Sequence, residues 1–377
     1  MNTKQVIAQS FNQIAEDILS GNYSPKVRIA LTTIGSEHDE KIWDQVASLI
    51  NGKEYTPVVI GKKIGDFEHY QADTLENAHQ IMNKLFAENK IDGAVTLHYD
   101  FPIGVSTVGK VITPALGKEM YIATTTGTTA INRVEAMVKN AIIGIATAKA
   151  NGLAQPSLGI LNVEGARQVE KMLMQLKKNG YEINFATSSR ADGGCVMRGN
   201  DLLLGVPDVM VCDSLTGNLL IKVFSAFNSG GNYEASGAGY GPGLATSDQT
   251  QINLINIISR ASGAPQIVQA LTYCAISASN KIMDINSNEL NQAQIAGLDD
   301  LFSSETKVKS DSNLCVKMPA KEIVTYQISG IDILEIEETC QKLWQENIYA
   351  ETGMGCTGPI ILVSDKNATK AKLILNM

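Results

Sequence analysis

Cys356 is the residue of this chain whose surroundings most favour nucleophilic chemistry. It lies in residues 352–359, TGMGCTGP, a run with three glycines and a proline, and the apolar stretch 360–363 follows directly. Glycine permits positive φ and a close backbone approach, and successive free N–H groups form a concave nest that favours an anion. A thiolate is an anion, so such a loop would lower the pKa of a thiol and expose its sulfur. The alternative is a tight turn before a buried strand, with Cys356 as a small apolar filler.

Arg260 is the second candidate, as the centre of an anion site. It lies in residues 259–265, SRASGAP, between the apolar run 252–258 and a predicted helix. An arginine fork binds phosphate through two parallel hydrogen bonds, and the hydroxyls of Ser259 and Ser262 at a helix N-terminus would complete the cradle. The alternative is an ion pair between Arg260 and a surface carboxylate, but the flanking serines favour the anion site.

Two more segments with polar side chains follow predicted strands. Residues 124–129, TTTGTT, are expected to open a helix whose free N–H groups suit an oxyanion or phosphate, although a threonine helix cap is the common alternative. Residues 213–218, DSLTGN, precede an apolar helix, and an aspartate at this place is also a frequent cap. The candidate binding residues of the two segments are Thr126, Gly127, Thr128, Asp213 and Asn218.

The elements that must position these residues alternate between short apolar strands and amphipathic helices. This pattern predicts an α/β fold with parallel sheets covered on both faces, in which ligands lie outside the carboxyl ends of the strands. We expect two doubly wound α/β domains and a small C-terminal α/β module. The first domain is predicted over residues 1–150 and completed by about 245–290, the second over 151–245, and the thiol-bearing module over 300–377.

The composition is that of an ordinary globular enzyme. The apolar fraction of 44% suffices for a large core, and the net charge of −8 argues against a nucleic-acid partner. The six cysteines form no C-x-x-C pair, and the four histidines all lie in the first hundred residues, so we expect no metal site. No apolar run reaches the length of a membrane span and the N-terminus has no signal-peptide pattern, which predicts a cytoplasmic protein.

These segments together resemble a known superfamily. Residues 91–95, the helix 130–152 and residues 258–260 are similar in order and spacing to phosphate acetyltransferases. Residues 198–218 resemble the acyl-phosphate synthase of phospholipid synthesis. Neither family carries a C-terminal thiol module. With residues 124–129, 237–243, 259–263 and 352–359 included, the chain resembles, essentially end to end, the alpha subunit of component C of the glycine/sarcosine/betaine reductase complex.

The resemblance implies a fold similar to phosphotransacetylases, with the second α/β domain inserted in the first. It also implies a reaction in which a selenoprotein partner, component A, carries a carboxymethyl group on selenium. This group passes as an acetyl group to a cysteine, and inorganic phosphate then cleaves the thioester to give acetyl phosphate. The cysteine carried over is Cys356, and the phosphate-binding pair is Ser259 and Arg260.

Other features of the site and its partners follow as expectations. Backbone N–H groups of the cysteine loop would form an oxyanion hole, for which the candidates are Gly355, Thr357 and Gly358. The beta subunit of component C is the expected second partner in an oligomeric assembly. Phosphate is a co-substrate, and no bound cofactor, no NAD and no metal is expected.

Two alternatives stay open at this point. Residues 162–165, NVEG, stand where phosphate acetyltransferases have a Ser/Thr/Gly-rich loop, and Gln266 stands near the place of an acid. Use of coenzyme A is therefore open, and a stand-alone phosphate acyltransferase that uses coenzyme A or an acyl carrier is one alternative. A non-catalytic docking subunit is the other. No histidine is near Cys356 in sequence, so no general base is assigned, and the source substrate remains glycine, sarcosine or betaine.

Overall fold

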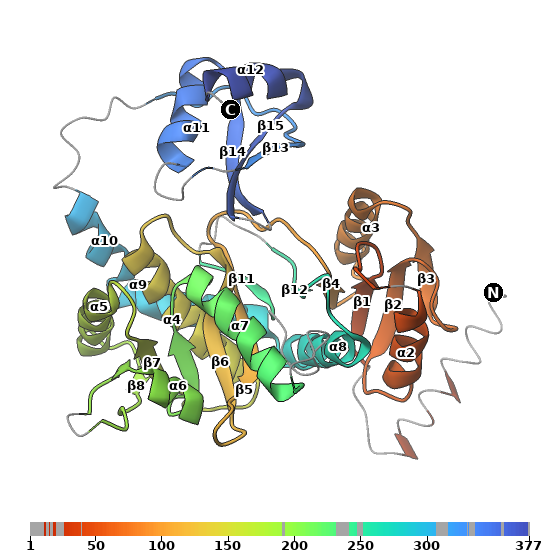
Figure 1. The fold of residues 1–377 in the computed structure, drawn as a ribbon, viewed down its shortest axis with the longest axis horizontal. Helices are drawn as coiled ribbons and strands as arrows, with labels where there is room; N and C mark the ends of the chain where they lie inside the picture. The colour runs from red at the N-terminus through yellow and green to blue at the C-terminus, as the bar shows by residue number, and fades with distance from the viewer. Residues whose placement is uncertain are drawn as a thin grey trace.

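The computed structural model describes residues 26–38, 40–190, 193–230, 241–246, 252–306, 316–329, 331, 336–355 and 358–375, together with residues 11, 12, 15, 18 and 19. These described residues form three β-sheets with helices packed against them (Figure 1). Two of the sheets contain parallel strands, and the third belongs to a small C-terminal unit.

The first sheet is parallel throughout, with the strand order β12-β4-β1-β2-β3. Its strands are β1 (Arg28–Thr32), β2 (Thr56–Gly61), β3 (Glu68–Gln71), β4 (Gly93–Thr96) and β12 (Ile255–Ile257). Helices α2 (Lys41–Ile50) and α8 (Ala264–Ser279) cover one face, and α3 (Leu75–Ala87) covers the other. Burial on both faces explains why the strands read as almost continuous apolar runs.

The second sheet is mixed, with the order β11-β5-β6-β10-β7-β8 and β9 paired to β7. Its strands are β5 (Val105–Ile112), β6 (Glu119–Thr128), β7 (Ser157–Leu161), β8 (Asn184–Phe185), β9 (Val196–Met197), β10 (Val209–Val211) and β11 (Gly243–Ala245). The pairs β11–β5 and β5–β6 are antiparallel, whereas β6, β10, β7 and β8 run parallel.

Helices cover both faces of the second sheet as well. One face packs against α4 (Arg133–Ala150), which also contacts α5 (Ala166–Lys178) and α9 (Ile282–Ile295). The other face packs against α7 (Ser214–Asn228), whose Ile221 and Phe224 share a core with Met120 and Ile122 of β6. The remaining helices are α6 (Gly199–Leu204) and α10 (Leu298–Thr306).

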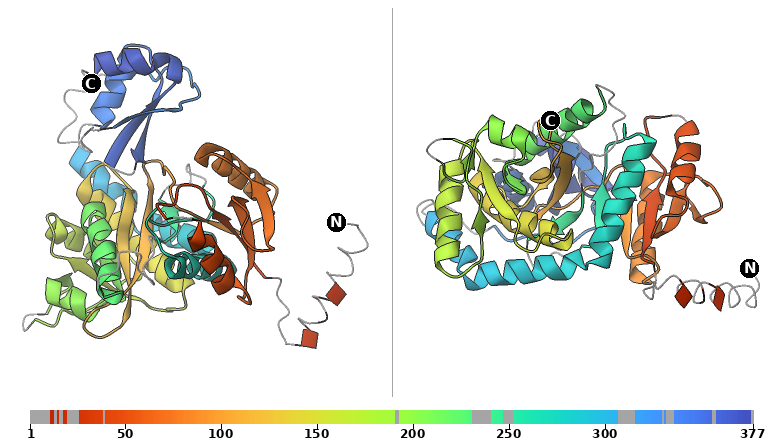
Figure 2. Two further views of the ribbon diagram at one scale, coloured as in Figure 1. Left: turned by 45° about the vertical axis from the view of Figure 1, so that its right-hand side comes forward. Right: turned by 90° about the horizontal axis from the view of Figure 1, so that it is seen from below.

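Helix α8 lies between the two sheets, as Figures 1 and 2 show from different sides. It packs against β4 and β1, and the hydroxyl of its Tyr273 donates a hydrogen bond of 3.2 Å to the Val108 carbonyl of β5. The following helix, α9, is tied to α4 by Glu289, which accepts from Lys149 Nζ at 2.6 Å and Tyr181 Oη at 2.9 Å. The chain thus returns to the first sheet through β12 and α8 and then packs on the second sheet.

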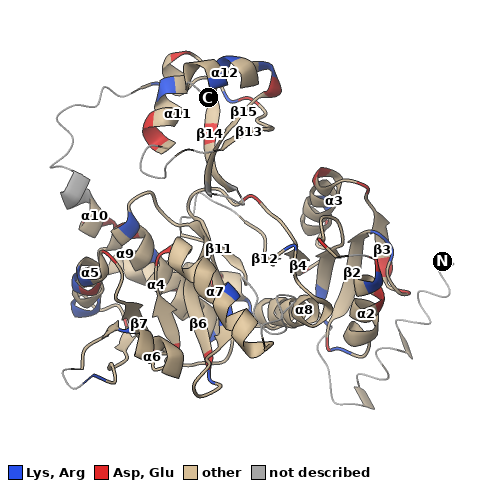
Figure 3. Ribbon diagram, viewed as in Figure 1, with Lys and Arg blue, Asp and Glu red and all other residues tan. Residues whose placement is uncertain are grey.

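The C-terminal unit has its own apolar core. Its antiparallel sheet has the order β13-β15-β14, formed by β13 (Tyr326–Ser329), β14 (Ala350–Gly355) and β15 (Gly358–Val363). Helices α11 (Ile336–Gln345) and α12 (Ala368–Ile374) pack on this sheet, with a 3-10 turn at Asp365–Asn367 between β15 and α12. Helix α11 carries Glu337 and Glu338 in its first turn and Lys342 in its last, whereas α12 carries two lysines and no acidic residue (Figure 3).

The predicted fold class is confirmed, because the described chain is α/β with parallel sheets and a small third unit. Two features differ in detail from the sequence pattern. Strand β14 includes residues 352–355, and β15 includes residues 358 and 359, of the glycine-rich run that was expected to be a loop. Strands β5 and β6, which lie within residues 1–150, share the second sheet with β7 and β10, and α4 packs on that sheet, so the predicted division between residues 150 and 151 falls between elements of one sheet.

Gly217 allows the close approach of α7 to β6 and gives a test of this packing. A Cβ at Gly217 would collide with the carbonyl oxygen of Thr124. We expect Gly217→Ala to lower the free energy of unfolding by about 3 kcal/mol, because backbone on both sides prevents relief of the clash. The measurement is the midpoint of urea-induced unfolding followed by circular dichroism.

Gly199→Ala in α6 is the matched control. A Cβ at Gly199 meets nothing within 4 Å, so we expect unchanged stability or a gain of up to about 1 kcal/mol. Equal unfolding midpoints for Gly217→Ala and the wild type would contradict the described packing of α7 on β6.

Candidate active site

The candidate active site forms where neighbouring strands of the first sheet end. Strands β12 and β4 are adjacent and parallel, with Ile257 opposite Thr96, so the segments that follow them leave the same edge of the sheet. The segment after β12 carries Arg260, and the segment after β4 carries His98. The sheet therefore brings together an arginine and a histidine that lie far apart in the sequence.

The loop of Arg260 is held by its own backbone and by the segment after β1. The Ser262 N–H donates to the Ser259 carbonyl at 3.0 Å, and the Ala261 N–H donates to Ser259 Oγ at 3.2 Å. The Glu37 N–H donates to the Arg260 carbonyl at 3.0 Å. The Arg260 side chain is exposed and forms no ion pair with any residue that the structure describes. Hydrogen bonds thus hold the backbone of the residue that carries the guanidinium.

Ser262 adds an unusual feature to this loop. Its side chain is fully buried, and its Oγ has no hydrogen-bond partner among the described residues. A buried hydroxyl without a partner costs free energy, and this one lies immediately before the N-terminus of the long helix α8. Arg260, Ser262 and the helix N-terminus together supply the donors that an oxyanion needs.

His98 and Asp100 are polar residues of this region that the sequence analysis did not single out. His98 Nε2 lies 3.3 Å from Asp100 Oδ1, and both side chains are mostly buried. Burial lowers the pKa of His98; the Asp100 carboxylate opposes this effect, and the positive charge of Arg260 lowers the pKa further. The only sequence signal was the polar run HYD directly after an apolar strand.

Thr126 and Gly127 line a small pocket to which His98 also contributes. The pocket is lined by His98, Tyr99, Phe101, Thr126, Gly127, Ile257 and Met354. Gly127 has φ of +75°, and a Cβ there would lie 2.5 Å from the Val105 carbonyl oxygen, so the position requires glycine. The structure therefore brings two of the predicted binding residues to the His98 side of the first sheet.

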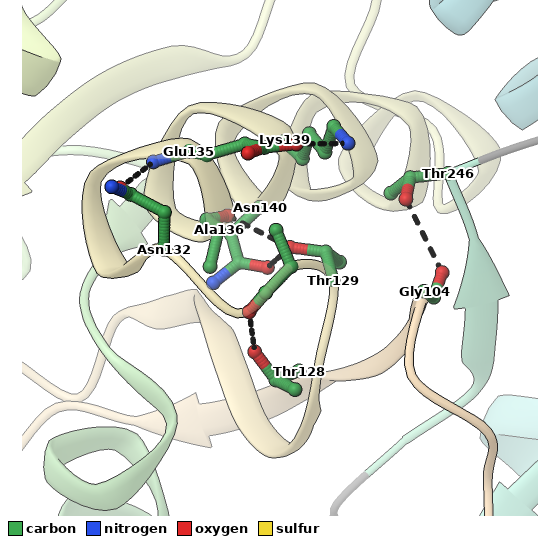
Figure 4. A network of polar contacts seen from close by, with 10 residues as sticks. Gly104, Thr128, Thr129, Asn132, Glu135, Ala136, Lys139, Asn140 and Thr246 are labelled. Carbon is green, nitrogen blue, oxygen red and sulfur yellow. Dashed lines mark hydrogen bonds and ion pairs between the residues drawn. The ribbon is translucent and has the colours of Figure 1, made fainter. Parts of the chain in front are cut away.

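The expectation that residues 124–129 open a helix is wrong. Strand β6 continues to Thr128, because β5 pairs with it up to Val105, and α4 begins only at Arg133 with Asn132 as its cap. The Thr128 hydroxyl donates to the Ala130 carbonyl at 2.6 Å (Figure 4). The local network of Figure 4 satisfies these polar groups inside the fold, and Thr126 is the one half-buried member of the run, whose other residues are buried.

Asp213 and Asn218 hold helix α7 in place. The Asp213 carboxylate accepts from the Thr216 N–H at 3.0 Å and from the Thr216 hydroxyl at 2.7 Å, as a helix cap does. Asn218 Nδ2 donates to the Thr125 carbonyl at 3.0 Å. Asp213 thus caps α7, Asn218 ties α7 to the strand that carries Thr126, and neither side chain lines the pocket.

The C-terminal unit places its β14–β15 hairpin at this pocket. The Met354 N–H donates to the Phe101 carbonyl at 3.2 Å, and Gly353 pairs with Pro102. Gly355 and Gly358 face each other across the two strands. Cys356 and Thr357 are the two residues between them in sequence, and they lie outside the described residues. The last described residues before Cys356 therefore contact the segment that carries His98 and Asp100.

The four cysteines that the structure describes are poor nucleophiles. Cys195, Cys212, Cys274 and Cys340 are all buried. Burial raises the pKa of each of the four thiols, to about 12 for Cys195 and Cys340. Of the six cysteines, only Cys315 and Cys356, which lie outside the described residues, remain as candidates for thiolate chemistry.

Another pocket lies elsewhere, between α4, α5 and β8. It measures about 380 Å³ and is lined by residues that include Lys149, Lys177 and Tyr181. None of the predicted site residues borders it. Among the described residues there is no cluster of His, Cys, Asp and Glu that could hold a metal ion, and no described helix is long and apolar enough to cross a membrane.

Comparisons with known proteins were made for sequence and for structure. A family model described as "Fatty acid synthesis protein" matches residues 27–362. The chain is 48% identical to the glycine/sarcosine/betaine reductase complex component C subunit alpha of Peptoclostridium acidaminophilum, over 99% of this chain and 97% of that protein. It is 26% identical to the phosphate acyltransferase of Thermotoga maritima, over 56% of this chain and 68% of the relative.

One solved structure is also similar. It is the EutD phosphotransacetylase from Staphylococcus aureus, with a TM-score of 0.42 and 14% sequence identity, over 68% of this chain and 94% of that one.

The burial of four thiols predicts a selective pattern of alkylation. Under native conditions iodoacetamide should label the four buried cysteines at least roughly tenfold more slowly than it does in urea, since alkylation needs an accessible thiolate. Peptide mass spectrometry over a time course measures this. Fast labelling of Cys195 or Cys340 in the folded protein would contradict the described burial, and labelling in urea provides the reference rates.

Proposed function

Since the chain belongs to the family of component C alpha subunits of the glycine/sarcosine/betaine reductase complex, we propose that it accepts an acetyl group on Cys356 and releases it to inorganic phosphate as acetyl phosphate. The relatives named phosphate acyltransferase support the acyl-transfer part of this proposal. The assignment of Cys356 as the acyl carrier and of inorganic phosphate as the acceptor rests on the residues of the candidate site.

The observation that carries the proposal is the docking of the β14–β15 hairpin. Met354 and Gly353 bond to Phe101 and Pro102, in the segment that leaves β4 beside the Arg260 loop. Cys356 is two residues beyond Met354 in the chain, and consecutive Cα atoms are about 3.8 Å apart. The hairpin residues before Cys356 thus contact the segment that leaves the sheet next to the Arg260 loop, which supports a shared role for the thiol and the loop.

Arg260 and Ser262 are the proposed phosphate ligands. The guanidinium would hold two phosphate oxygens and neutralise their charge, while the buried Ser262 hydroxyl would gain the hydrogen bond that it lacks within the described chain. The N-terminus of α8 adds free N–H groups. Thr126 and Gly127, across the pocket, would contact the acyl group.

The chemistry balances as an acyl transfer. A phosphate oxygen attacks the carbonyl carbon of the thioester, the C–O bond forms and the C–S bond breaks. Hydrogen phosphate contributes one proton, which ends on the leaving sulfur, so that acetyl phosphate and a free thiol result. A thiolate is a good nucleophile in the first step and a good leaving group in the second, and two easier steps replace one difficult step.

The acetyl group would come from a carboxymethyl group on the selenium of component A. Converting carboxymethyl to acetyl is a two-electron reduction: the C–Se bond would break, the methylene carbon would gain a proton, and one carboxyl oxygen would leave as water as the C–S bond to Cys356 forms. The electrons would come from the selenium centre of that partner, which would end bonded to a second thiol of the partner as a selenenyl sulfide. A beta subunit of component C would complete the assembly, as the name of the relative suggests. Coenzyme A is not required, and acetyl exchange between coenzyme A and phosphate by the isolated chain would instead favour a stand-alone acyltransferase.

Acetylation of the thiol tests the first half of this proposal. Incubation of the chain with acetyl phosphate should add one acetyl group, which peptide mass spectrometry locates on Cys356, because the reaction is reversible. Cys356→Ser should reduce acetyl-phosphate-dependent labelling by a factor of at least about 10².

Cys315→Ser is the matched control, since Cys315 is the other cysteine outside the described residues. It should retain wild-type labelling. Normal acetyl phosphate formation by the full complex with Cys356→Ser would refute the role of this thiol.

Phosphate binding tests the second half. Arg260→Gln keeps a polar side chain but loses the charge, and it should raise the KM for phosphate about 10- to 100-fold, the effect of one lost charge-assisted interaction. Arg133→Gln is the control, because Arg133 pairs with Glu164 on the surface. The measurement is the phosphate dependence of thioester cleavage. Equal KM values for Arg260→Gln and the wild type would remove Arg260 from the site.

A further inference from the structure

Helix α7 carries an apolar stripe along its outer face. The α7 stripe consists of Leu215, Leu219, Val223 and Phe227, which follow one another at intervals of four residues and are all exposed. Figure 1 shows α7 in front of the second sheet, at the surface of the molecule. Single exposed apolar residues are common on soluble proteins, but an uninterrupted row of them on one helix marks a surface that binds something.

The inner face of α7 is already covered by the second sheet. Ile221 and Phe224 are buried in the core that α7 shares with β6. A helix that is covered on one face only has polar and charged residues on the other. In α7, however, Lys222 is the only charged residue among the 15 of the helix (Figure 3). The helix is therefore apolar on two faces, as is typical of a helix that is covered from both sides.

The area of the stripe fits a protein interface. The exposed fractions are 81% for Leu215, 62% for Leu219, 50% for Val223 and 62% for Phe227. For residues of this size these fractions amount to roughly 450 Å² of accessible surface. Apolar patches of about 300–600 Å² are the largest that monomers expose and are often functional. A stable interface takes about 800 Å² from each partner, so the stripe alone supplies more than half of this area.

Two more exposed leucines lie near the C-terminal end of α7. They are Leu116, in the turn between β5 and β6, and Leu203 of α6. The Ala115 N–H donates to the Leu203 carbonyl at 3.2 Å, which joins the turn to α6. Asn228 Nδ2, at the end of α7, donates to the Ile112 carbonyl at the end of β5 at 3.0 Å. The apolar surface thus extends beyond the helix, toward the area that a stable dimer needs.

The stripe suits contact with an identical helix. Residues four apart form one ridge on a helix, and two such ridges interdigitate in the commonest class of helix packing. A twofold axis through the middle of the stripe places Leu219 of one copy against Val223 of the other, and the reverse. Lys222 lies on the row beside the stripe, where its Nζ donates to Asn218 Oδ1 at 2.8 Å. No charged residue therefore lies within the centre of the contact, as is typical of the core of an interface.

A lipid surface fits α7 less well. Helices that lie on a membrane carry several lysines and arginines on their polar face. Helix α7 has the single Lys222, and its inner face is packed on the second sheet. The charge of the helix therefore favours a protein partner over anionic lipid.

We propose that a second copy of this chain packs on the α7 stripe, so that the protein is a twofold symmetric dimer. This inference does not depend on the role assigned to Cys356. Asn218 ties α7 to the Thr125 carbonyl, so the interface supports, from behind, the strand that carries Thr126. Each copy contributes the same residues, and the contact closes without a free end.

The test is the dissociation constant of the dimer of the full chain, measured by sedimentation equilibrium. The wild type should be dimeric at about 10 μM, as expected for an interface of standard area. Leu219→Glu should raise the dissociation constant by a factor of at least about 10², because symmetry places two unpaired carboxylates in the contact. Circular dichroism checks that the variant is folded.

Ile295→Glu is the matched control. Ile295 is 80% exposed at the end of α9, and α9 packs on α4, on the other side of the second sheet from α7. The same change of an exposed apolar side chain to glutamate should there leave the dissociation constant within about twofold of the wild type.

Three results would overturn the proposal. The first is a wild-type chain that is monomeric at about 10 μM, the concentration of the test. The second is a dimer whose dissociation constant is the same in folded Leu219→Glu. The third is a monomer whose binding to a different subunit, or to vesicles of phosphatidylcholine and phosphatidylglycerol, is lost in Leu219→Glu, because the stripe would then belong to that partner.

Val223→Thr decides the question if Leu219→Glu does not fold. Threonine has nearly the shape of valine, and Val223 is exposed in the chain by itself. The variant replaces a methyl group by a hydroxyl group at two symmetric places of the contact, so the dissociation constant should rise about tenfold or more. An unchanged dissociation constant would overturn the assignment of the stripe to a second copy.

Discussion

The parallel pairing of β12 with β4 is the constraint on which the rest of the site depends. With Ile257 opposite Thr96, the Arg260 loop and the His98 segment must leave the same edge of the first sheet. Helix α8 follows the Arg260 loop and packs back on β4 and β1, which locks this register through buried apolar contacts. A shift of one residue would turn the buried side chains of β12 to the wrong face. The same strand register therefore fills the core and makes the Arg260 loop and the His98 segment neighbours.

The C-terminal unit also contributes to the site, and it has an apolar core of its own. It meets the rest of the chain through a few polar contacts with residues 100–102, and Ile103 and Ile131 add apolar contacts. Asp100 contacts both parts of the chain, since it accepts a hydrogen bond from Gln327 of the C-terminal unit and lies beside His98 of the first sheet's edge. This arrangement suits a thiol that takes a group from a partner protein and gives it to phosphate.

Most strands and helices could be predicted from the sequence, because apolar periodicity is a local property. The Arg260 loop could also be predicted, since its arginine, serines and helix start are contiguous in sequence. His98 and Asp100 could not, because their place beside the Arg260 loop follows from pairing between β4 and β12 and from contacts with β13. The error at residues 124–129 has the same origin: the threonines continue β6 because β5 pairs with it, and β5 was not predicted. The glycine-rich run 352–359 likewise forms much of a hairpin, since β15 supplies a partner strand.

The central claim is that one thiol on the hairpin carries an acyl group to phosphate held at the Arg260 loop. A pulse–chase measurement tests it most directly. The chain is acetylated with radiolabelled acetyl phosphate, freed of excess reagent and mixed with unlabelled inorganic phosphate. The account predicts that the label leaves the protein as acetyl phosphate, at a rate that rises and saturates with phosphate concentration. Label that stays on the protein, or that leaves as acetate at the same rate without phosphate, would contradict it.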